Sequence, residues 1–453
     1  MNRKYYIILL FTCLSLAGCK KYLDTKPDEA LTLLSDNLNS LQLLLDNTEQ
    51  MNTSYPSANL MTTDDIQVTD ASWQNLYQRS IVSANAYIWQ EDVFNASDRN
   101  DWSLSYVTVL NANLVLDNLD QGNNAKRAEI EKRNIKGQAL FFRAFAYYQL
   151  LQEFAKPYDA QMANTDLGIV LRATSNISVP ASRSTVAECY QAIIGDLLEA
   201  SNLLDADQLY KSRPTKGAAY ALLAKTYLLM DNYREALNMA EQSLQLNRDL
   251  LDLNDLDNQT VYPIERFNRE VSFHASMSNI TGVLYPNSSV SAELYALYEE
   301  NDLRKSLYFN YKNESDIQFK GSYTQGYELF MGISNNEVYL LAAECYARLG
   351  EYEKGMDFLN ELLIHRYKTG SFESLLAQNQ QDALRIILKE RRKELLFREV
   401  RWSDIRRLSK DSEHKITVRR NVLAKEYVLE PGDRRYVFTI PLKVIDLGGI
   451  EQN

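Results

Sequence analysis

Residues that commonly carry out catalysis are sparse in this 453-residue sequence, which contains three histidines and four cysteines. The histidines lie far apart, at positions 274, 365 and 414, and no HExxH motif is present. The sequence also lacks the GxxxxGK[ST] and GxGxxG motifs that bind phosphates and dinucleotides, and the GxSxG turn of serine hydrolases. We therefore predict a protein that is not an enzyme and that uses no cofactor.

Two acidic segments have residues that could bind a cation or transfer protons. Asp252–Asp257 has the acidic spacing of a calcium loop, but its turn position lacks glycine and Pro263 stands where the bidentate glutamate should be. Asp64 and Asp65 form a carboxylate pair within Asn52–Asp70, a Ser- and Thr-rich segment that we predict to be a loop, where like charges are usually solvated. We predict no metal site at either segment.

Aromatic side chains are the main candidates for ligand contact, because the chain contains 29 tyrosines and four tryptophans. Two groups stand out in the sequence: Trp73, Tyr87, Trp89 and Trp102 in the N-terminal third, and Tyr285, Tyr308, Tyr311, Tyr323 and Tyr327 further along. Flat aromatic faces on loops suit sugar rings, and neighbouring Asp, Asn and Arg side chains can bind the hydroxyls. Packing in the core is the alternative for each of them, and we expect it for Trp102 and Trp402.

The net charge limits the range of partners. Lys plus Arg number 49 against 60 for Asp plus Glu, which gives a net charge of −11. A polyanion would meet a repulsive field, so we expect no nucleic-acid partner.

The N-terminus has the features of a bacterial lipoprotein signal. Residues 1–18 combine a basic start, an apolar run and small residues at the end, which is typical of a cleaved secretory signal. The sequence Leu-Ala-Gly-Cys ending at Cys19 resembles a lipobox, in which Cys19 becomes the acylated first residue. Two or three acyl chains anchor a protein stably to a membrane. Residues 19–30 would then form a tether, and a plain secreted protein is the alternative.

The remaining cysteines of the mature chain, Cys189 and Cys345, both lie in strongly helical patterns. We predict buried free thiols, with a disulfide as the alternative.

Helical periodicity dominates the chain and recurs in pairs of helices. Gly217–Asn247 has small and large residues at the intervals of a tetratricopeptide unit, and Glu337–Arg366 repeats the pattern. A third unit is split by an insertion into Ala139–Phe154 and Thr185–Leu204. We predict an all-α fold, a tetratricopeptide-type superhelix, with a generic array of helical hairpins as the alternative.

Residues 250–335 have few helical signals and many aromatic and turn residues. A connection of this length is unusual in a compact domain unless it is functional, so we predict a long, irregular, ligand-binding insertion. A charged helix over Asp382–Leu408 and a short strand over Tyr436–Ile440 are expected to follow. The predicted parts of a single domain spanning residues 31–453 are helical repeats at about 129–247 and 337–366, the insertion at about 250–335, and a C-terminal helix and tail at 382–453.

The charged stretch Arg385–Arg407 contains nine basic and four acidic residues. An anion-binding patch is one interpretation. The acidic residues alternate with basic ones at i,i+3 and i,i+4 spacing beside an apolar face, which favours a structural helix with local ion pairs.

These features together resemble the SusD/RagB family of outer-membrane lipoproteins. The resemblance covers essentially the whole chain in family order, and its strongest motifs are DWSLSYVTVLNANLVLDNLD at Asp101–Asp120, KGQALFFRAFAYYQLLQEFAKP at Lys136–Pro157 and RPTKGAAYALLAKTYL at Arg213–Leu228. The ending DLGGIEQN departs from the family's usual N-x-x-L-x-Q-N.

The resemblance implies a SusD-like, surface-exposed lipoprotein of Bacteroidetes-type bacteria, held in the outer membrane by lipid on Cys19. Such proteins capture oligosaccharides, or peptides in RagB-like members, and pass them to a SusC-like TonB-dependent transporter. An assembly scaffold without ligand is a further alternative. On this basis we expect ligand contacts at Asp65, Trp73, Tyr87, Trp89, Tyr285, Asn287, Tyr323 and Tyr327.

Overall fold

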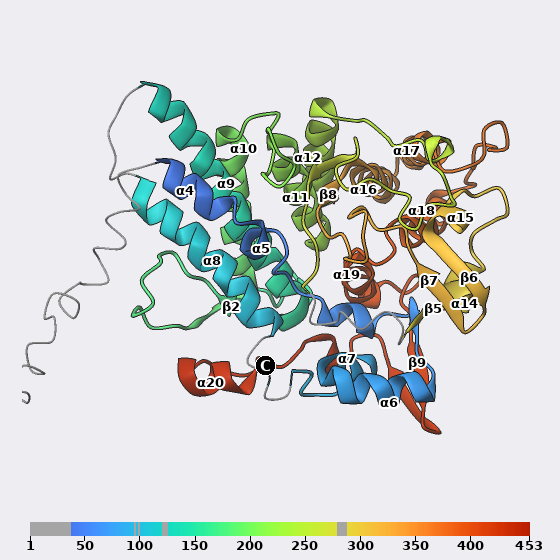
Figure 1. Cartoon of the computed structure of the whole chain (residues 1–453), viewed down its shortest axis with the longest axis horizontal. Helices are drawn as coiled ribbons and strands as arrows, with labels where there is room; N and C mark the ends of the chain where they lie inside the picture. The colour runs from blue at the N-terminus through green and yellow to red at the C-terminus, as the bar shows by residue number, and fades with distance from the viewer. Residues whose placement is uncertain (1–37, 95–96, 98–99, 120–125, 279–287) are drawn as a thin grey trace, which may run out of the picture.

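The structure is a computed structural model that describes residues 38–453 except 95–96, 98–99, 120–125 and 279–287 (Figure 1). The predicted signal peptide, Cys19 and the tether therefore lie outside the described residues. Within the described part of the chain, no helix is both long enough and apolar enough to cross a membrane.

Helices stacked side by side form the body of the molecule. The consecutive members of this stack are α8 (Asp101–Asn118), α9 (Lys126–Phe154), α10 (Val186–Leu203), α11 (Lys216–Leu229), α12 (Tyr233–Leu246), α16 (Asn335–Arg348), α17 (Tyr352–Leu363) and α18 (Gln380–Glu394). Each packs against the next along the stack. The predicted repeat units correspond to the pairs α11–α12 and α16–α17, and the split unit corresponds to α9 and α10. The predicted tetratricopeptide-type fold is confirmed.

Local sequence explains where these helices begin and how closely they pack. Thr185 and Glu188 form a reciprocal capping box at the start of α10, and the Thr215 hydroxyl accepts the Ala218 N–H at the start of α11. Gly355 lets α17 cross α16 closely, because a Cβ there would lie 2.6 Å from the carbonyl oxygen of Ala343.

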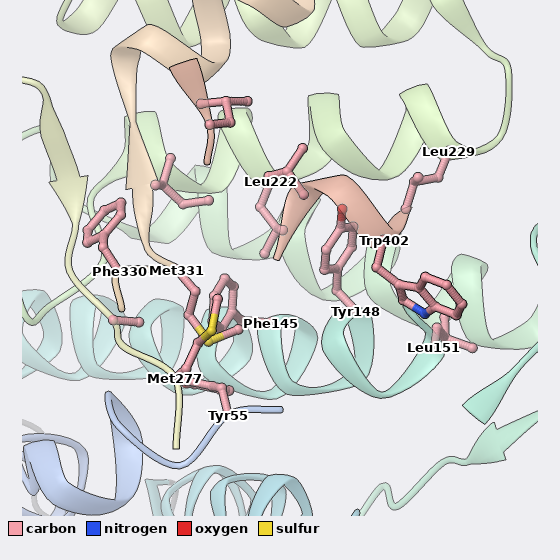
Figure 2. Close-up of a cluster of buried hydrophobic side chains, with 14 of the residues drawn as sticks. Tyr55, Phe145, Tyr148, Leu151, Leu222, Leu229, Met277, Phe330, Met331 and Trp402 are labelled. Carbon is pink, nitrogen blue, oxygen red and sulfur yellow. The ribbon is translucent and has the colours of Figure 1, made fainter. Parts of the chain in front are cut away.

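The main hydrophobic core lies between the repeats and the segments that cover them. In Figure 2, Tyr148 points from α9 towards the helix that carries Leu222, α11, and Leu151 lies beside the Trp402 ring. Trp402 of α19 (Val400–Arg407) is fully buried in the same cluster, as predicted. The predicted structural role of Trp102 is also confirmed, since its ring packs against Tyr106 and is almost fully buried.

The two cysteines of the described chain, Cys189 and Cys345, are buried and free, as predicted. Burial raises the pKa of the Cys189 thiol to about 11 and also raises that of Cys345.

The N-terminal segments wrap one side of the stack. They comprise α4 (Leu38–Leu45), α5 (Thr48–Met51), η1 (Ala58–Thr62), β1 (Ile66–Gln67), α6 (Asp70–Arg79) and α7 (Ile81–Tyr87). The predicted loop Asn52–Asp70 is mostly buried rather than solvated, and it contains η1 and β1. A short antiparallel pair, β2 (Leu167–Val170) and β3 (Arg183–Thr185), occupies the connection between α9 and α10.

The insertion contains short antiparallel strand pairs and small helices among its loops. Its elements are η3 (Leu253–Asp255), β4 (Val271–Phe273), β5 (Ser289–Val290), α14 (Ala292–Tyr295), α15 (Arg304–Tyr308), β6 (Phe309–Asn313), β7 (Asp316–Phe319) and β8 (Ile333–Ser334). β4 pairs with β8, β6 pairs with β7, and β5 pairs with β1. The last pairing joins the insertion to the N-terminal segment.

The C-terminal region differs from the prediction in two ways. The single helix expected over Asp382–Leu408 is divided into α18 and α19, because Phe397 and Glu399 both have positive φ angles. The strand expected over Tyr436–Ile440 is also wrong: η6 (Arg434–Tyr436) is followed there by irregular chain.

The C-terminal region instead contains elements that the sequence did not predict. β9 (Val418–Val422) and β10 (Lys425–Leu429) form a hairpin. The remaining elements are η5 (Leu408–Lys410) and α20 (Leu442–Gly448).

Candidate ligand site

Two of the predicted ligand contacts, Tyr87 and Trp89, are buried and hold an arginine. The guanidinium carbon of Arg420 lies 3.9 Å from the Tyr87 ring centroid and 4.5 Å from that of Trp89. The guanidinium also donates to the carbonyl groups of Met61, Tyr87 and Thr63. These aromatic faces bind a protein cation from β9, so neither ring has a face free for a sugar. Trp89 also lines a cavity of about 810 Å³, so its ligand contact stays a prediction.

The ring of Tyr323 is likewise covered by an arginine of the protein. Its ring lies 3.9 Å from the guanidinium carbon of Arg398, and its hydroxyl donates to Glu270 at 2.5 Å. The side chain is completely buried, so it is not available to a ligand. Burial raises the pKa of its hydroxyl well above the usual value.

Asp65 and its neighbour Asp64 are bound by arginines of the C-terminal helices. Arg392 pairs with both carboxylates, and Arg401 pairs with Asp64 at 2.8 Å. Burial opposes ionisation of Asp64, but Arg401 and Arg392 outweigh it and hold its pKa below the usual range. The expected solvated pair is thus a buried connection between distant segments, and the prediction that Asp65 contacts ligand is not supported.

These arginines also correct the interpretation of the stretch Arg385–Arg407. Its charged residues make buried pairs with distant segments in addition to the predicted local pairs. Arg407, for example, binds Glu344 of α16 with two nitrogens, at 2.7 and 2.8 Å. The stretch is structural, as predicted, but it acts mainly as a tertiary connection.

A buried ionic cluster fixes the insertion to the helical stack. Among the described residues it contains four cations and four carboxylates: Arg304, Arg366, Lys393 and Arg398 with Glu270, Asp302, Glu390 and Glu394. Glu394 occupies its centre, accepting from Arg304 and Arg366. Because the charges balance and are hydrogen-bonded, the burial cost of each ion is offset by its partners.

The accessible part of the predicted site begins with Trp73 on α6. Its ring is half-buried, its Nε1 donates to the Ala84 carbonyl at 3.4 Å, and its centroid lies 5.4 Å from that of Tyr77. Tyr77 is 51% exposed. Tyr77 was not singled out from the sequence, although its i+4 spacing from Trp73 on a polar helix was a usable signal.

A second exposed aromatic pair lies on the insertion. Tyr295 at the end of α14 and Tyr311 on β6 are stacked, with centroids 4.9 Å apart and an interplanar angle of 15°. Tyr311 is 47% exposed. Tyr327 is also exposed, at 58%, whereas Tyr285 and Asn287 lie outside the described residues.

The strands place these two pairs on either side of one surface. β1, which precedes α6, pairs with β5, and β5 contacts β7 through the Ser289 hydroxyl, which bonds both backbone groups of Ile317. β7 in turn pairs with β6. The order β1–β5–β7–β6 spans on the order of 15 Å, and Figure 1 shows β5 between α6 and the β6–β7 hairpin.

Gln67 lies on this surface and links its parts. Its amide nitrogen donates to Ser289 and to the Glu314 carbonyl, and its oxygen accepts the Ala292 N–H. Polar contacts therefore hold this surface together. We call it the aromatic face, and its rings are the exposed Tyr77 and Tyr311 and the half-buried Trp73 and Tyr295.

The aromatic face has no metal-binding arrangement. Across the described ranges, no group of three or more His, Cys, Asp and Glu side chains is placed to hold a metal. In the calcium-like segment, Asp252 accepts from Asn254 at the start of η3 and lies 3.6 Å from His365.

Comparison with known proteins is decisive at the level of the family. Residues 21–228 match the family described as "Starch-binding associating with outer membrane", and residues 288–437 match the "SusD family". The chain belongs to the SusD family. A SusD-like protein P2 from Formosa agariphila is 26% identical, over 69% of this chain and 72% of that protein.

Solved SusD structures share the fold of this SusD-family chain. A SusD superfamily protein from Bacteroides vulgatus matches with a TM-score of 0.75 and 21% identity, covering 92% of this chain and 99% of its own. A SusD superfamily protein from Bacteroides thetaiotaomicron matches with a TM-score of 0.73 and 20% identity, and the match covers 92% of this chain and 99% of that protein. A SusD-like carbohydrate binding protein from Bacteroides vulgatus matches with a TM-score of 0.67 and 19% identity, and the match covers 91% of this chain and 96% of that protein.

Proposed function

We propose that this protein is a surface lipoprotein that captures a glycan at the aromatic face and passes it to a SusC-like TonB-dependent outer-membrane transporter. The observation that carries the proposal is two aromatic pairs on one strand-supported surface, the tilted pair Trp73–Tyr77 and the stacked pair Tyr295–Tyr311, each of which contains one exposed tyrosine. Membership of the SusD family and the carbohydrate-binding description of a structural relative support it.

The chemistry of the aromatic face fits a sugar chain. Each ring offers a flat apolar face to the axial C–H groups of a sugar, and each tyrosine hydroxyl remains able to bond a sugar hydroxyl. Because the two pairs are separated by the width of several strands, a chain of sugars would contact both, whereas a single sugar would contact one.

The binding test uses the chain from residue 20 onward, titrated calorimetrically with soluble polysaccharides, oligosaccharides of increasing length and mixed peptides. We expect saturable binding of one glycan, with affinity that increases with chain length. Tyr311→Ala and Tyr77→Ala should each weaken it roughly 2- to 13-fold, the equivalent of about 0.5–1.5 kcal/mol for one aromatic contact.

A matched control is Tyr210→Ala, which removes a similarly exposed tyrosine from the turn between α10 and α11. Its glycan affinity should be unchanged. Binding of peptides alone would favour the RagB-like alternative. If the Tyr311 and Tyr77 variants bind the glycan as tightly as the unaltered protein does, the ligand binds elsewhere. If the protein binds nothing in the panel, the scaffold alternative is favoured.

The membrane part of the proposal has its own tests. Mass spectrometry of the protein from its native membrane should find diacylglycerol on Cys19, and Cys19→Ala should release the protein from the membrane. Affinity purification of the anchored protein should recover a TonB-dependent barrel in a stoichiometric complex, and recovery without any barrel would contradict the transporter partnership.

A further inference from the structure

An apolar pocket of about 390 Å³ lies at one end of the molecule, remote from the aromatic face. Its floor is formed by Trp102, Tyr106, Val109 and Leu110 of α8. One wall comes from the connection between β2 and β3 and the other from α20. This volume is within the range of about 300–1,000 Å³ that is typical of small-molecule pockets.

The rim of this pocket exposes apolar side chains to water, which is unfavourable in free energy unless a ligand covers them. Ile177 is 80% exposed and Leu447 is 81% exposed, and both line the pocket. α20 buries none of its residues, although four of its seven residues are apolar. A contiguous exposed apolar surface of this kind marks a binding site.

The walls of the pocket are held in place by internal hydrogen bonds. The Tyr106 hydroxyl donates to the Val170 carbonyl and accepts its N–H, and the Tyr147 hydroxyl does the same with Arg172. Asp117 accepts three hydrogen bonds from Thr174 and Ser175. The wall is therefore preorganised.

These same bonds identify the chemistry of the ligand. Many of the polar groups that line the pocket are used within the protein: Asn113 donates to the carbonyls of Arg172 and Thr174 and accepts from Arg143, and Arg172 donates to Val179. A sugar or peptide that entered would therefore lose most of its bonds to water without replacement. An alkyl chain has no such requirement.

We propose that this pocket binds an acyl chain, and that the chain is one of the two or three carried by Cys19 of the same molecule, while the others remain in the membrane. α4, where the described chain begins at Leu38, packs against α8, the helix that forms the pocket floor. Figure 1 shows α4, α8 and α20 at the same end of the molecule. The 18 residues between Cys19 and Leu38 can extend to about 60 Å, so the anchor reaches the pocket. This inference rests on the lipidation of Cys19 in the proposed function.

The first experiment measures fatty-acid binding to the pocket in a chain that carries no acyl group of its own. The mature chain from position 19, made without acylation and carrying Cys19→Ala, is titrated with straight-chain fatty acids from C8 to C14, with Trp fluorescence as readout. We expect one saturable site, with affinity rising about fourfold per added methylene, equivalent to about 0.8 kcal/mol, until the pocket is full.

Two variants and a control locate that site. Ile177→Glu and Leu447→Glu place a charge on the rim, and because both positions are exposed the fold should tolerate them. Each should lower fatty-acid affinity at least tenfold, whereas Leu376→Glu, at another highly exposed leucine outside the pocket, should not. Absence of saturable binding, or equal effects of all three variants, would overturn the pocket assignment.

The second experiment tests the source of the acyl chain. In the unacylated mature chain, Cys19 can be alkylated selectively with a tetradecyl maleimide in detergent-free buffer, because Cys189 and Cys345 are buried. We expect the alkylated chain to lose binding of added fatty acid. If it binds added fatty acid as well as the unalkylated chain does, the occupant is not the molecule's own anchor. Neither result depends on whether Cys19 is lipidated in the cell, which mass spectrometry tests separately.

Discussion

Arginine side chains explain why several aromatic residues of the sequence are unavailable to ligand. The guanidinium groups of Arg420 and Arg398 each lie over aromatic rings, and each uses its N–H groups on protein acceptors. An arginine and a sugar ring use the same feature of an aromatic side chain, its electron-rich face. Sequence identifies the aromatic residue but not which partner reaches that face, because the arginines are far away in the chain.

Three buried carboxyl groups meet around the η1 segment. Asn59 donates to Glu399 with its side chain at 2.6 Å and to Glu153 with its backbone at 3.3 Å. Asp101 accepts the N–H groups of Ser57 and Ala58, both at 2.8 Å. Burial raises the pKa of all three carboxyl groups, and that of Glu399 to about 8.

The stability of the protein should therefore decrease as the pH rises from about 4.5 to 8. In this range folded Glu399 holds a proton that the unfolded chain releases, although Lys225 and Arg406 partly favour its charged form. For such a group, each pH unit lowers the free energy of unfolding by up to about 1.4 kcal/mol. Glu399→Gln should flatten this dependence in urea unfolding at pH 6 and 8.5.

Glu426→Gln, at an exposed position on β10, is the control for this pH dependence and should leave the slope unchanged. If the free energy of unfolding depends on pH equally in the native protein and in Glu399→Gln, Glu399 does not hold the proton.

At the scale of elements, the β9–β10 hairpin has an unusual turn. Leu423 and Ala424 both have positive φ angles, 51° and 60°, where the two-residue turn of a hairpin normally has Asn-Gly. Residues with a Cβ pay about 1–2 kcal/mol in this conformation. The sequence Leu-Ala thus gives no turn signal, which is why the hairpin was missed.

Replacing this turn with Leu423→Asn and Ala424→Gly should stabilise the protein by about 1 kcal/mol, after the entropy cost of glycine in the unfolded chain is subtracted. Thermal unfolding measures the gain. Ala424→Val, which adds β-branching at the same position, should be destabilising, and a stabilising effect of valine would contradict the assigned turn.

The elements differ in how well sequence predicts them. α11, α12, α16 and α17 follow from local periodicity and caps, so their existence and approximate bounds were predictable. The break between α18 and α19 contains neither proline nor glycine, and it depends on tertiary contacts such as Asn59 with Glu399. The sequence singled out Trp73 as a ligand contact and Tyr311 as a candidate aromatic, but not that they share one surface, because that surface forms through pairings between strands of two to five residues.

At the scale of the whole molecule, the buried ionic cluster joins the ligand-bearing insertion to the repeats. Although burial opposes its charge, Arg366 and Arg304 lower the pKa of Glu394 to about 2. The unfolded chain binds a proton near pH 4.5, so this contribution to stability is complete above that value and is lost as the pH falls towards 2.

Glu394→Gln should cost about 3–5 kcal/mol, because it leaves two buried guanidiniums without their shared partner. Hydrogen exchange should increase first in the insertion, and the acid dependence should weaken. Glu361→Gln breaks the exposed pair with Arg248 and should cost less than about 1 kcal/mol. A similar cost for both variants would mean that the cluster does not fix the insertion.

The tyrosine hydroxyls that hold the wall of the apolar pocket have a second consequence. Tyr106 and Tyr147 satisfy both backbone groups of Val170, the last residue of β2, and of Arg172, two residues beyond it. Unpaired backbone groups of a strand are a template for pairing with another chain. Here two side chains take the place of a neighbouring strand. Copies of the protein crowded together therefore find no free backbone at these residues through which to aggregate.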